Sequence, residues 1–232
     1  MKKTVFIHGL FGHVSDFNSI SEPDDILINL EDHDHEFLSF QSVAESIKNQ
    51  IDLLTKNPCN LVGYSMGGRL AMQLKVLYPE KFDRCAFIGS RLNMDFDFFH
   101  KRILWQAEME LSLAFLPLKE FFKIWYSQEL FNSFKWTDFQ DRRLKLNKHF
   151  HQKCLNQLNL FFQQDFRNLL LPYQSKLLFI HGEQDLVYKK YYQRISKKGY
   201  IIQEIKSSSH PTILEQPETT KQTIKTFFDY AI

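Results

Sequence analysis

The chain has 232 residues, of which 44% are apolar and 24% charged, and its mean hydropathy is −0.34. This profile is typical of one globular domain with a sizeable core. The formal net charge of +2 argues against a nucleic-acid partner, because nucleic-acid binding needs a large basic field. Three widely spaced cysteines without a CxxC pattern, Cys59, Cys85 and Cys154, indicate a reduced protein of the cytoplasm.

Membrane association and secretion are not expected either. The apolar run after the first lysines covers only residues 5–7, which is too short for the core of a secretory signal. No stretch approaches the ~18 consecutive apolar residues of a membrane span. The sequence carries no signal for the number of subunits.

Short apolar runs alternate along the chain with longer segments of helical periodicity. Strands are predicted at residues 4–7, 26–30, 60–64, 85–88, 176–180 and 200–205. Helices are predicted at residues 41–54, around 70–77, and from about 212 or 217 to 230. This alternation indicates a parallel sheet that is covered by helices on both faces.

Residues 93–173 interrupt the alternation between the fourth and fifth predicted strands. The segment has helical periodicity, few turn signals and many of the chain's 23 phenylalanines, which would either line an apolar cleft or fill a core. We expect a helical lid over the carboxyl edge of the sheet, where open α/β sheets bind ligands. The sequence thus predicts one domain, with a core of residues 1–92 and 174–232 and a lid of about 93–173.

The strongest local motif is Gly63-Tyr64-Ser65-Met66-Gly67, a G-x-S-x-G between a predicted strand and a predicted helix. This context is typical of the nucleophile elbow of the α/β-hydrolase fold. The elbow is a strained turn, and side chains at its two glycines would collide with neighbouring backbone. We therefore predict an α/β-hydrolase fold with a mostly parallel sheet of about six strands and Ser65 as the catalytic serine. The alternative is an ordinary Gly/Ser turn.

A loop rich in glycine, His8-Gly9-Leu10-Phe11-Gly12, follows the first predicted strand. In this fold the loop lies beside the elbow and supplies one backbone N–H of an oxyanion hole, and the residue after the nucleophile supplies the other. We assign these donors to Leu10 and Met66. The alternative is a plain turn between a strand and a helix.

A serine nucleophile needs a partner imidazole, which in turn needs an orienting carboxylate, and in this fold the chain order is Ser, Asp, His. Asp185 follows the fifth predicted strand, and His210 lies in the loop before the last helix. These two residues are predicted to complete the triad, with Glu183 as the alternative acid. His210 itself would otherwise be a surface histidine.

No metal or organic cofactor is expected. His33 and His35 lie in a dense acidic stretch, but nothing elsewhere completes a ligand set with suitable spacing.

Two longer stretches resemble the 2-succinyl-6-hydroxy-2,4-cyclohexadiene-1-carboxylate synthases of menaquinone biosynthesis. The elbow with its continuation, Gly63-Tyr64-Ser65-Met66-Gly67-Gly68-Arg69-Leu70-Ala71, is similar to that family's form of the motif. The lid stretch 117–131, which contains Trp125-Tyr126 and ends in Leu130-Phe131, is similar to a segment of the family's lid. The His-Gly-Glu-x-Asp and Ser-His-Pro contexts also fit, although many hydrolases share them.

The resemblance implies a lyase that eliminates pyruvate from a tricarboxylate, with the triad as general base and an oxyanion hole for the enolate. A small anionic substrate of this kind needs cationic partners. Cations of the lid that are available for this role are Lys101, Arg102, Arg142, Arg143 and Lys148. Arg102 and Arg143 lie nearest to the family's substrate arginines, with a solvated surface charge as the alternative for each. Tyr64 and Trp125 are candidates for the pocket walls, although Trp125 would equally suit a core position.

The chain also departs from the family. It reads Asn29-Leu30-Glu31-Asp32-His33-Asp34 where the family has Asp-Leu-Pro-Gly-His-Gly, and it begins at the first parallel strand without the usual hairpin. Two alternatives therefore stay open. The first is a small carboxylesterase or thioesterase, for example one acting on an acyl-carrier-protein methyl ester, which the phenylalanine content favours. The second is a non-catalytic binding protein, which the presence of all three triad residues disfavours.

Overall fold

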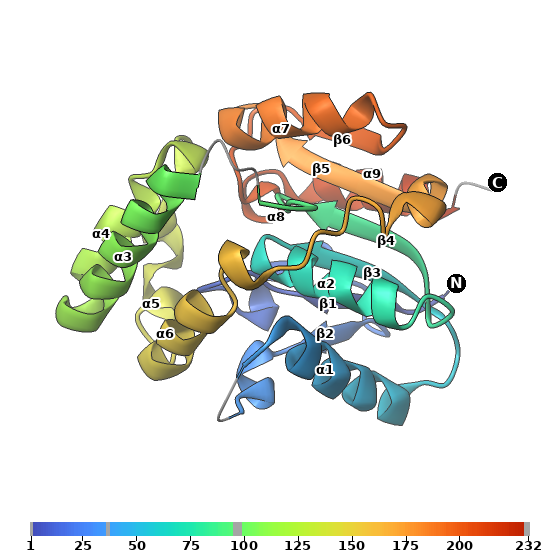
Figure 1. Ribbon diagram of the computed structural model, residues 1–232, viewed down its shortest axis with the longest axis horizontal. Coiled ribbons are helices and arrows are strands. Elements are labelled where there is room, and N and C mark those ends of the chain that lie inside the picture. Colours follow the sequence, from blue (N-terminus) through green and yellow to red (C-terminus); the bar gives the residue numbers. More distant parts are fainter. Residues whose placement is uncertain (1, 36–37, 95–98, 230–232) are drawn as a thin grey trace.

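The computed structural model describes residues 2–35, 38–94 and 99–229. The predicted fold class is confirmed: the described residues form a six-stranded parallel sheet with helices on both faces (Figure 1). Its strands are β1 (Thr4–Ile7), β2 (Ile26–Ile28), β3 (Cys59–Tyr64), β4 (Phe82–Ile88), β5 (Leu177–Gly182) and β6 (Ile201–Ile205). They are arranged in the order β2-β1-β3-β4-β5-β6.

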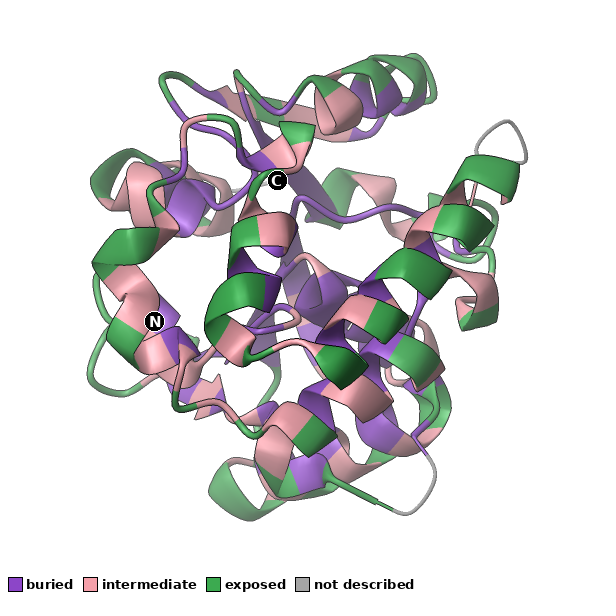
Figure 2. Ribbon diagram, turned by 90° about the vertical axis from the view of Figure 1, so that its left-hand side faces the viewer, coloured by how far each residue is buried: buried purple, intermediate pink, exposed green. Residues whose placement is uncertain are grey.

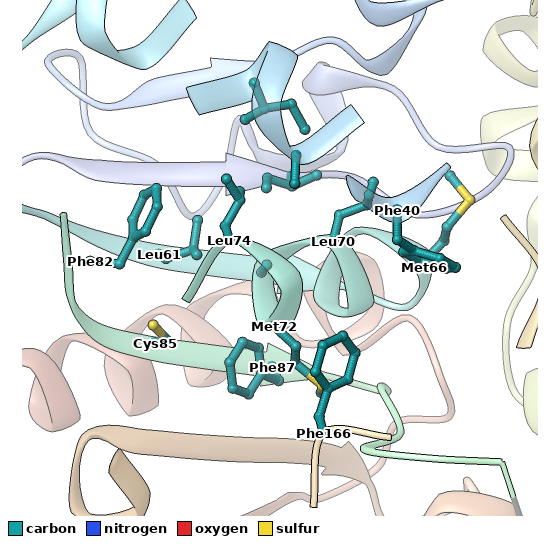
Figure 3. Packing of buried hydrophobic residues seen from close by; sticks show 14 of the residues in the cluster. Phe40, Leu61, Met66, Leu70, Met72, Leu74, Phe82, Cys85, Phe87 and Phe166 are labelled. Atoms are coloured by element: carbon teal, nitrogen blue, oxygen red, sulfur yellow. The ribbon is translucent and has the colours of Figure 1, made fainter. Parts of the chain in front are cut away.

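Strand residues alternate between two apolar layers, as the pleat of a strand requires. Val5 and Ile7 of β1 point to the layer beneath α1 (Phe40–Leu54), α2 (Met66–Leu77) and α7 (Leu186–Ser196). Phe6 points to the opposite layer, beneath the short helix η1 (Val14–Phe17), α8 (Thr212–Glu215) and α9 (Pro217–Asp229). In the first layer, Figure 3 shows Met72 of α2 packed with Phe87 and Phe166.

The segment between β4 and β5 is helical, as expected, and we call it the helical insertion. Its helices are α3 (Phe99–Phe115), α4 (Leu118–Tyr126), η4 (Glu129–Phe131), η5 (Trp136–Phe139), α5 (Gln140–Arg143), α6 (Lys148–Gln157), η6 (Leu160–Phe162) and η7 (Leu171–Lys176). Residues 95–98 of the predicted lid lie outside the described residues. α3 to α6 lie to one side of the sheet, beyond the carboxyl ends of the strands (Figure 1).

The helices of the insertion are amphipathic, with exposed and buried bands along them (Figure 2). Many of their buried residues form a separate apolar cluster, which includes Phe121, Phe122 and Trp125 and also takes in Phe11 from the loop after β1. Others, such as Phe150 of α6, pack with the first layer of the sheet. The insertion therefore packs on the part of the core that carries the predicted oxyanion loop. None of the helices within the described ranges is both long and apolar enough to cross a membrane.

The strand register brings the predicted site loops to one edge. Ile7 at the end of β1 pairs with Gly63 of β3, and Ile180 of β5 pairs with Ile88 of β4. Because all the strands are parallel, the segments after β1, β3, β5 and β6 leave the sheet at the same edge.

Candidate active site

Ser65 lies in a strained turn between β3 and α2. Its backbone has φ 53° and ψ −113°, a conformation that costs a non-glycine residue about 1–3 kcal/mol and is found mostly at functional sites. The flanking glycines are required by close packing, as the motif predicts. A Cβ atom on Gly63 would lie 2.5 Å from the carbonyl oxygen of Gly67, and one on Gly67 would lie 2.1 Å from that of Ile7.

The structure brings the three predicted triad residues together. The Nε2 atom of His210 lies 3.1 Å from Ser65 Oγ, and its Nδ1 atom lies 2.7 Å from Asp185 Oδ2. With its proton on Nδ1, the neutral imidazole donates to Asp185, so Nε2 is left to accept the hydroxyl proton of Ser65. This is the arrangement that a general base acting through serine needs.

Asp185 is fixed by the helix that it begins. It is fully buried and is the N-cap residue of α7, where its Oδ1 atom accepts a hydrogen bond of 3.0 Å from the Tyr188 backbone N–H. Its other oxygen is thereby left to the imidazole. The alternative acid, Glu183, instead accepts from Lys206 and from the Ser207 backbone N–H.

The loop after β1 is held by the helical insertion. Gly12 N–H donates to Gly9 O at 3.0 Å, and within this turn Phe11 has a positive φ of 57°. The Phe11 ring packs at centroid distances of 4.8 Å from Trp125 and 5.1 Å from Phe121. These contacts hold the side chain of a residue whose backbone is in the left-handed region.

The two residues predicted to supply the oxyanion hole line the same cavity. Leu10 and Met66 line it together with Ser65 and His210. Met66 is the first residue of α2, so its N–H has no acceptor within its own helix. No hydrogen bond joins the Leu10 N–H to an acceptor in the part of the chain that the structure describes. Both amides are therefore free to bind an anionic oxygen at Ser65.

The cavity has a volume of about 390 Å³ and lies between the sheet edge and the insertion. Much of its wall is apolar or aromatic, formed by Leu10, Met66, Met94, Trp105, Trp125, Leu130, Phe131, Leu155, Leu158, Leu160, Val187 and Tyr188. Four cations also line it: Arg69, Arg91, Lys101 and Arg102. The described lining residues include no aspartate or glutamate.

The guanidinium groups of Arg69 and Arg102 are largely buried from solvent. Burial lowers the pKa of Arg69 to about 10. Burial, and then repulsion by Arg69, lowers the pKa of Arg102 to about 9. Both side chains still carry a full charge at neutral pH. In each, one buried nitrogen, Nη1 of Arg69 and Nε of Arg102, has no hydrogen-bond partner among the described residues. Mutual repulsion and unused donors together favour an anionic ligand.

The predicted substrate residues are only partly at the cavity. Arg102 and Trp125 line it, and Arg102 lies 3.8 Å from the centre of the Trp105 ring. Tyr64 is buried behind His210, with 5.4 Å between the two ring centres, and is absent from the described lining. It therefore supports the imidazole and not the substrate.

Arg143 requires the larger correction. It is 97% buried but does not line the cavity, and its Nη2 donates to Asp16 Oδ2 at 3.0 Å. Two further predicted cations also have other partners, since Arg142 is paired with the same Asp16 and Lys148 donates to backbone carbonyls. The substrate cations were predicted from their position in the lid sequence, whereas the structure pairs Arg143 with Asp16 of η1.

Sequence reasoning missed Arg69, Arg91 and Tyr188. Arg69 had a usable signal, because it lies four residues after Ser65 on α2 and residues spaced i,i+4 share a helix face. Tyr188 lies one turn after Asp185, and its ring centre is 5.0 Å from that of His210. Arg91 follows β4 and stacks near the Tyr188 and Tyr191 rings. Only the fold reveals this position.

The histidines of the acidic loop have other partners. His33 bonds Ser46 through Nδ1 at 2.8 Å and Gln50 through Nε2 at 3.0 Å. Within the described ranges no three His, Cys, Asp or Glu side chains are grouped as metal ligands would be. The three cysteines are free and buried, at separate places in the core.

Comparisons with known proteins place the chain in a family. A family model of the alpha/beta hydrolase fold matches residues 32–210. A Haemophilus influenzae protein named "Putative esterase/lipase" is 37% identical over 93 residues, which are 36% of this chain and 32% of that protein. The chain thus spans about a third of the length of this relative.

A second Haemophilus influenzae protein matches over most of its length. It is named "Putative 2-succinyl-6-hydroxy-2,4-cyclohexadiene-1-carboxylate synthase" and is 26% identical over 206 residues, 80% of this chain and 81% of that protein. Among solved structures, MenH from S. aureus superposes with a TM-score of 0.78 at 18% identity and covers 98% of this chain and 93% of its own. At this identity the structural likeness shows a shared fold. Because the family model covers more than half of the sequence, the chain belongs to the alpha/beta hydrolase fold family.

Proposed function

We propose that the protein is a pyruvate-eliminating lyase that forms 2-succinyl-6-hydroxy-2,4-cyclohexadiene-1-carboxylate. The observation that carries this proposal is the charge of the cavity. Arg69, Arg91, Lys101 and Arg102 line it together with Ser65, and no carboxylate is among the described lining residues. Cations gathered in this way suit a substrate with several carboxylates, since each buried carboxylate needs a partner to offset its lost hydration.

The reaction uses the triad as a base. His210 Nε2 accepts the Ser65 hydroxyl proton, and the Ser65 oxygen takes a proton from a ring carbon of the substrate. The electron pair left on that carbon is delocalised as an enolate, whose oxygen accepts the N–H groups of Leu10 and Met66. The enolate then collapses to the new ring double bond while the C–O bond to the enolpyruvyl group breaks. The departing enolpyruvate takes the proton from His210 at its methylene carbon and leaves as pyruvate, so the triad returns to its starting state.

Sequence likeness supports the same reaction. The Haemophilus influenzae protein named as a putative synthase of this product matches four fifths of the chain, including the elbow and the insertion. The Trp125 side chain of the lid motif lies on the cavity wall, in reach of a bound ring.

The second candidate is a small serine carboxylesterase or thioesterase. The apolar and aromatic part of the cavity wall favours it, because such a wall suits an acyl chain. The relative named as a putative esterase/lipase supports it as well. In that reaction Ser65 would attack the ester carbonyl, and Leu10 and Met66 would bind the tetrahedral oxyanion.

One assay separates the two functions. The purified protein is given the succinyl-enolpyruvyl-cyclohexene tricarboxylate, and pyruvate release is followed with lactate dehydrogenase and NADH. In parallel it is given p-nitrophenyl acetate and butyrate. The lyase proposal predicts rapid pyruvate release and slow ester hydrolysis. Ester hydrolysis without pyruvate release would contradict it and favour the esterase.

A further inference from the structure

The loop that carries His210 is attached to the helical insertion as well as to the sheet. The backbone N–H of His210 donates to the carbonyl oxygen of Leu130 in η4 at 2.9 Å. The next residue of the insertion, Phe131, stands edge-on to the imidazole with 5.7 Å between ring centres. The proposed base is therefore contacted by a segment of the helical insertion that is about 80 residues away in the sequence.

Glu215, at the end of α8, makes a second connection of this kind. Its Oε2 atom accepts from both the backbone N–H and the hydroxyl of Ser209, each at 2.7 Å. Its Oε1 atom accepts the hydroxyl of Ser133, in the insertion just after η4. Ser209 is fully buried and directly precedes His210. Glu215 itself does not line the cavity, so it has no contact with a bound substrate.

We propose that Glu215 is a positioning residue: through its bonds to Ser133 and Ser209, the position of the helical insertion on the sheet determines the position of the His210 imidazole. This inference rests on the proposed role of His210 as a base and is independent of which substrate is used. Because Ser133, Glu215, Ser209 and His210 form one connected series of bonds, the insertion cannot move away from the sheet without breaking the Ser133 bond and the Leu130 bond. The imidazole is then fully aligned only while the insertion covers the cavity.

The consequence for catalysis follows from geometry. Without Glu215, the buried N–H and hydroxyl of Ser209 lose their acceptor, and the loop must shift to find another. His210 lies one residue further on, where a shift of about 1 Å in a reacting group costs on the order of 100-fold in rate. Substrate binding is affected less, since the cations of the cavity are elsewhere.

Three single variants, the double variant Ser133→Ala/Glu215→Ala and one control test the proposal. Glu215→Ala removes all three bonds. Glu215→Gln keeps them without the charge, because its carbonyl oxygen accepts from Ser209 while its amide donates to the Ser133 hydroxyl. Ser133→Ala removes only the link to the insertion. Glu80→Ala removes an exposed carboxylate far from the site and serves as the matched control.

Two readouts are measured on each variant. The first is turnover, by pyruvate release or by p-nitrophenyl acetate hydrolysis, according to which reaction the wild type performs. The second needs no substrate: in ¹⁵N-histidine-labelled protein, the NMR resonance of the His210 Nδ1–H that is bonded to Asp185 reports the placed imidazole. Ser65→Ala is included as a reference for the triad itself.

We expect Glu215→Ala to lower kcat about 10- to 100-fold with KM changed less than about twofold, and to broaden the His210 resonance. Glu215→Gln should stay within about threefold of the wild type, Ser133→Ala should be intermediate, and Ser133→Ala should add nothing once Glu215 is Ala. Wild-type kcat and an unchanged resonance in Glu215→Ala would overturn the proposal, as would a Glu215→Gln variant as impaired as Glu215→Ala. Full activity in Ser65→Ala would contradict the triad assignment instead.

Discussion

Arg143 of the helical insertion donates to Asp16 of η1, the short helix after β1, at 3.0 Å, with both side chains buried. Burial by itself lowers the pKa of Arg143, but Tyr126 and Asp16 raise it above its usual value overall. The guanidinium is thus a permanent charge whose partner belongs to the core. This pair joins the insertion to η1, which follows the loop that bears Leu10, much as Glu215 joins it to the loop that bears His210.

Arg143→Ala should therefore act mainly on stability. Loss of one member of a buried ion pair costs about 3–5 kcal/mol, and without Arg143 the buried Asp16 keeps only the more exposed Arg142, at 3.4 Å. Arg142→Ala is the matched control, because Arg142 pairs with the same Asp16 from a more exposed position and should cost less than about 1 kcal/mol. Urea unfolding of both variants measures the difference. If Arg143→Ala unfolds at the wild-type urea concentration, the pair has no such role.

Ser65→Ala should abolish catalysis and leave the fold unchanged. Removal of a triad serine costs several orders of magnitude in kcat, up to about 10⁶-fold, because the triad acts as a unit. Alanine also fits the strained turn at φ 53° no worse than serine does. The kcat of the purified variant is compared with that of the wild type, with circular dichroism as the check on folding. A rate near that of the wild type would refute the assignment of Ser65.

The cations at the cavity should distinguish a carboxylated substrate from a neutral one. Arg69→Ala and Arg102→Ala should each weaken transition-state binding of the tricarboxylate by about 2–5 kcal/mol, because each removes a partner of a buried carboxylate. This corresponds to a fall in kcat/KM of roughly 30- to several thousand-fold. Hydrolysis of a neutral p-nitrophenyl ester should hardly change. Lys119→Ala, an exposed cation on α4, provides the control. Equal losses on both substrates would indicate damage to the site and not a loss of charge recognition.

The sequence predicts those parts of the site that depend on local order. The G-x-S-x-G motif, a strand before Asp185 and a loop histidine before the last helix place three residues at one sheet edge, and in the structure these three lie within hydrogen-bonding distance. Their catalytic role stays a prediction. The strands were also predicted from the sequence, although β4 begins at Phe82, three residues earlier than predicted. The charged residues Asp83 and Arg84 interrupt the apolar run from which the strand was predicted.

The partners of the cations could not be predicted in this way. Arg143 and Arg102 are both basic residues of the helical insertion. Arg143 pairs with Asp16, whereas Arg102 lines the cavity. The difference depends on how the insertion sits on the core, which is a matter of tertiary packing. The link from Ser133 to Glu215 spans 82 positions and has no local signal for the same reason.

The last prediction concerns His151, a buried histidine whose ring nitrogens have no hydrogen-bond partner among the described residues. A carboxylate oxygen of Glu31 lies 3.7 Å from Nε2, which is too long for a hydrogen bond. It packs against Phe11 and Phe150, each with 5.2 Å between ring centres. Burial lowers its pKa to about 3, from an ordinary value of 6.5, and repulsion by the protonated form of His8 and by Arg143 contributes less. The folded protein therefore holds His151 neutral, whereas the unfolded chain takes up a proton below pH 6.5.

The sign of the effect on stability follows. Between pH 6.5 and 3 the unfolded state binds more protons at this residue, so the free energy of unfolding falls as the pH is lowered through that window, by about 3 kcal/mol between pH 7 and 4. His151→Phe removes this loss and, at pH 7, should be neutral or stabilising by about 1 kcal/mol, because it replaces two unpaired polar atoms with apolar ones. Urea unfolding at pH 7 and pH 4 measures both quantities. His149→Gln, at an exposed neighbouring position, should leave the pH dependence as it is. If His151→Phe retains the full loss of stability between pH 7 and 4, protonation of another group is responsible, with buried His8, whose pKa burial lowers to about 4, as the next residue to replace.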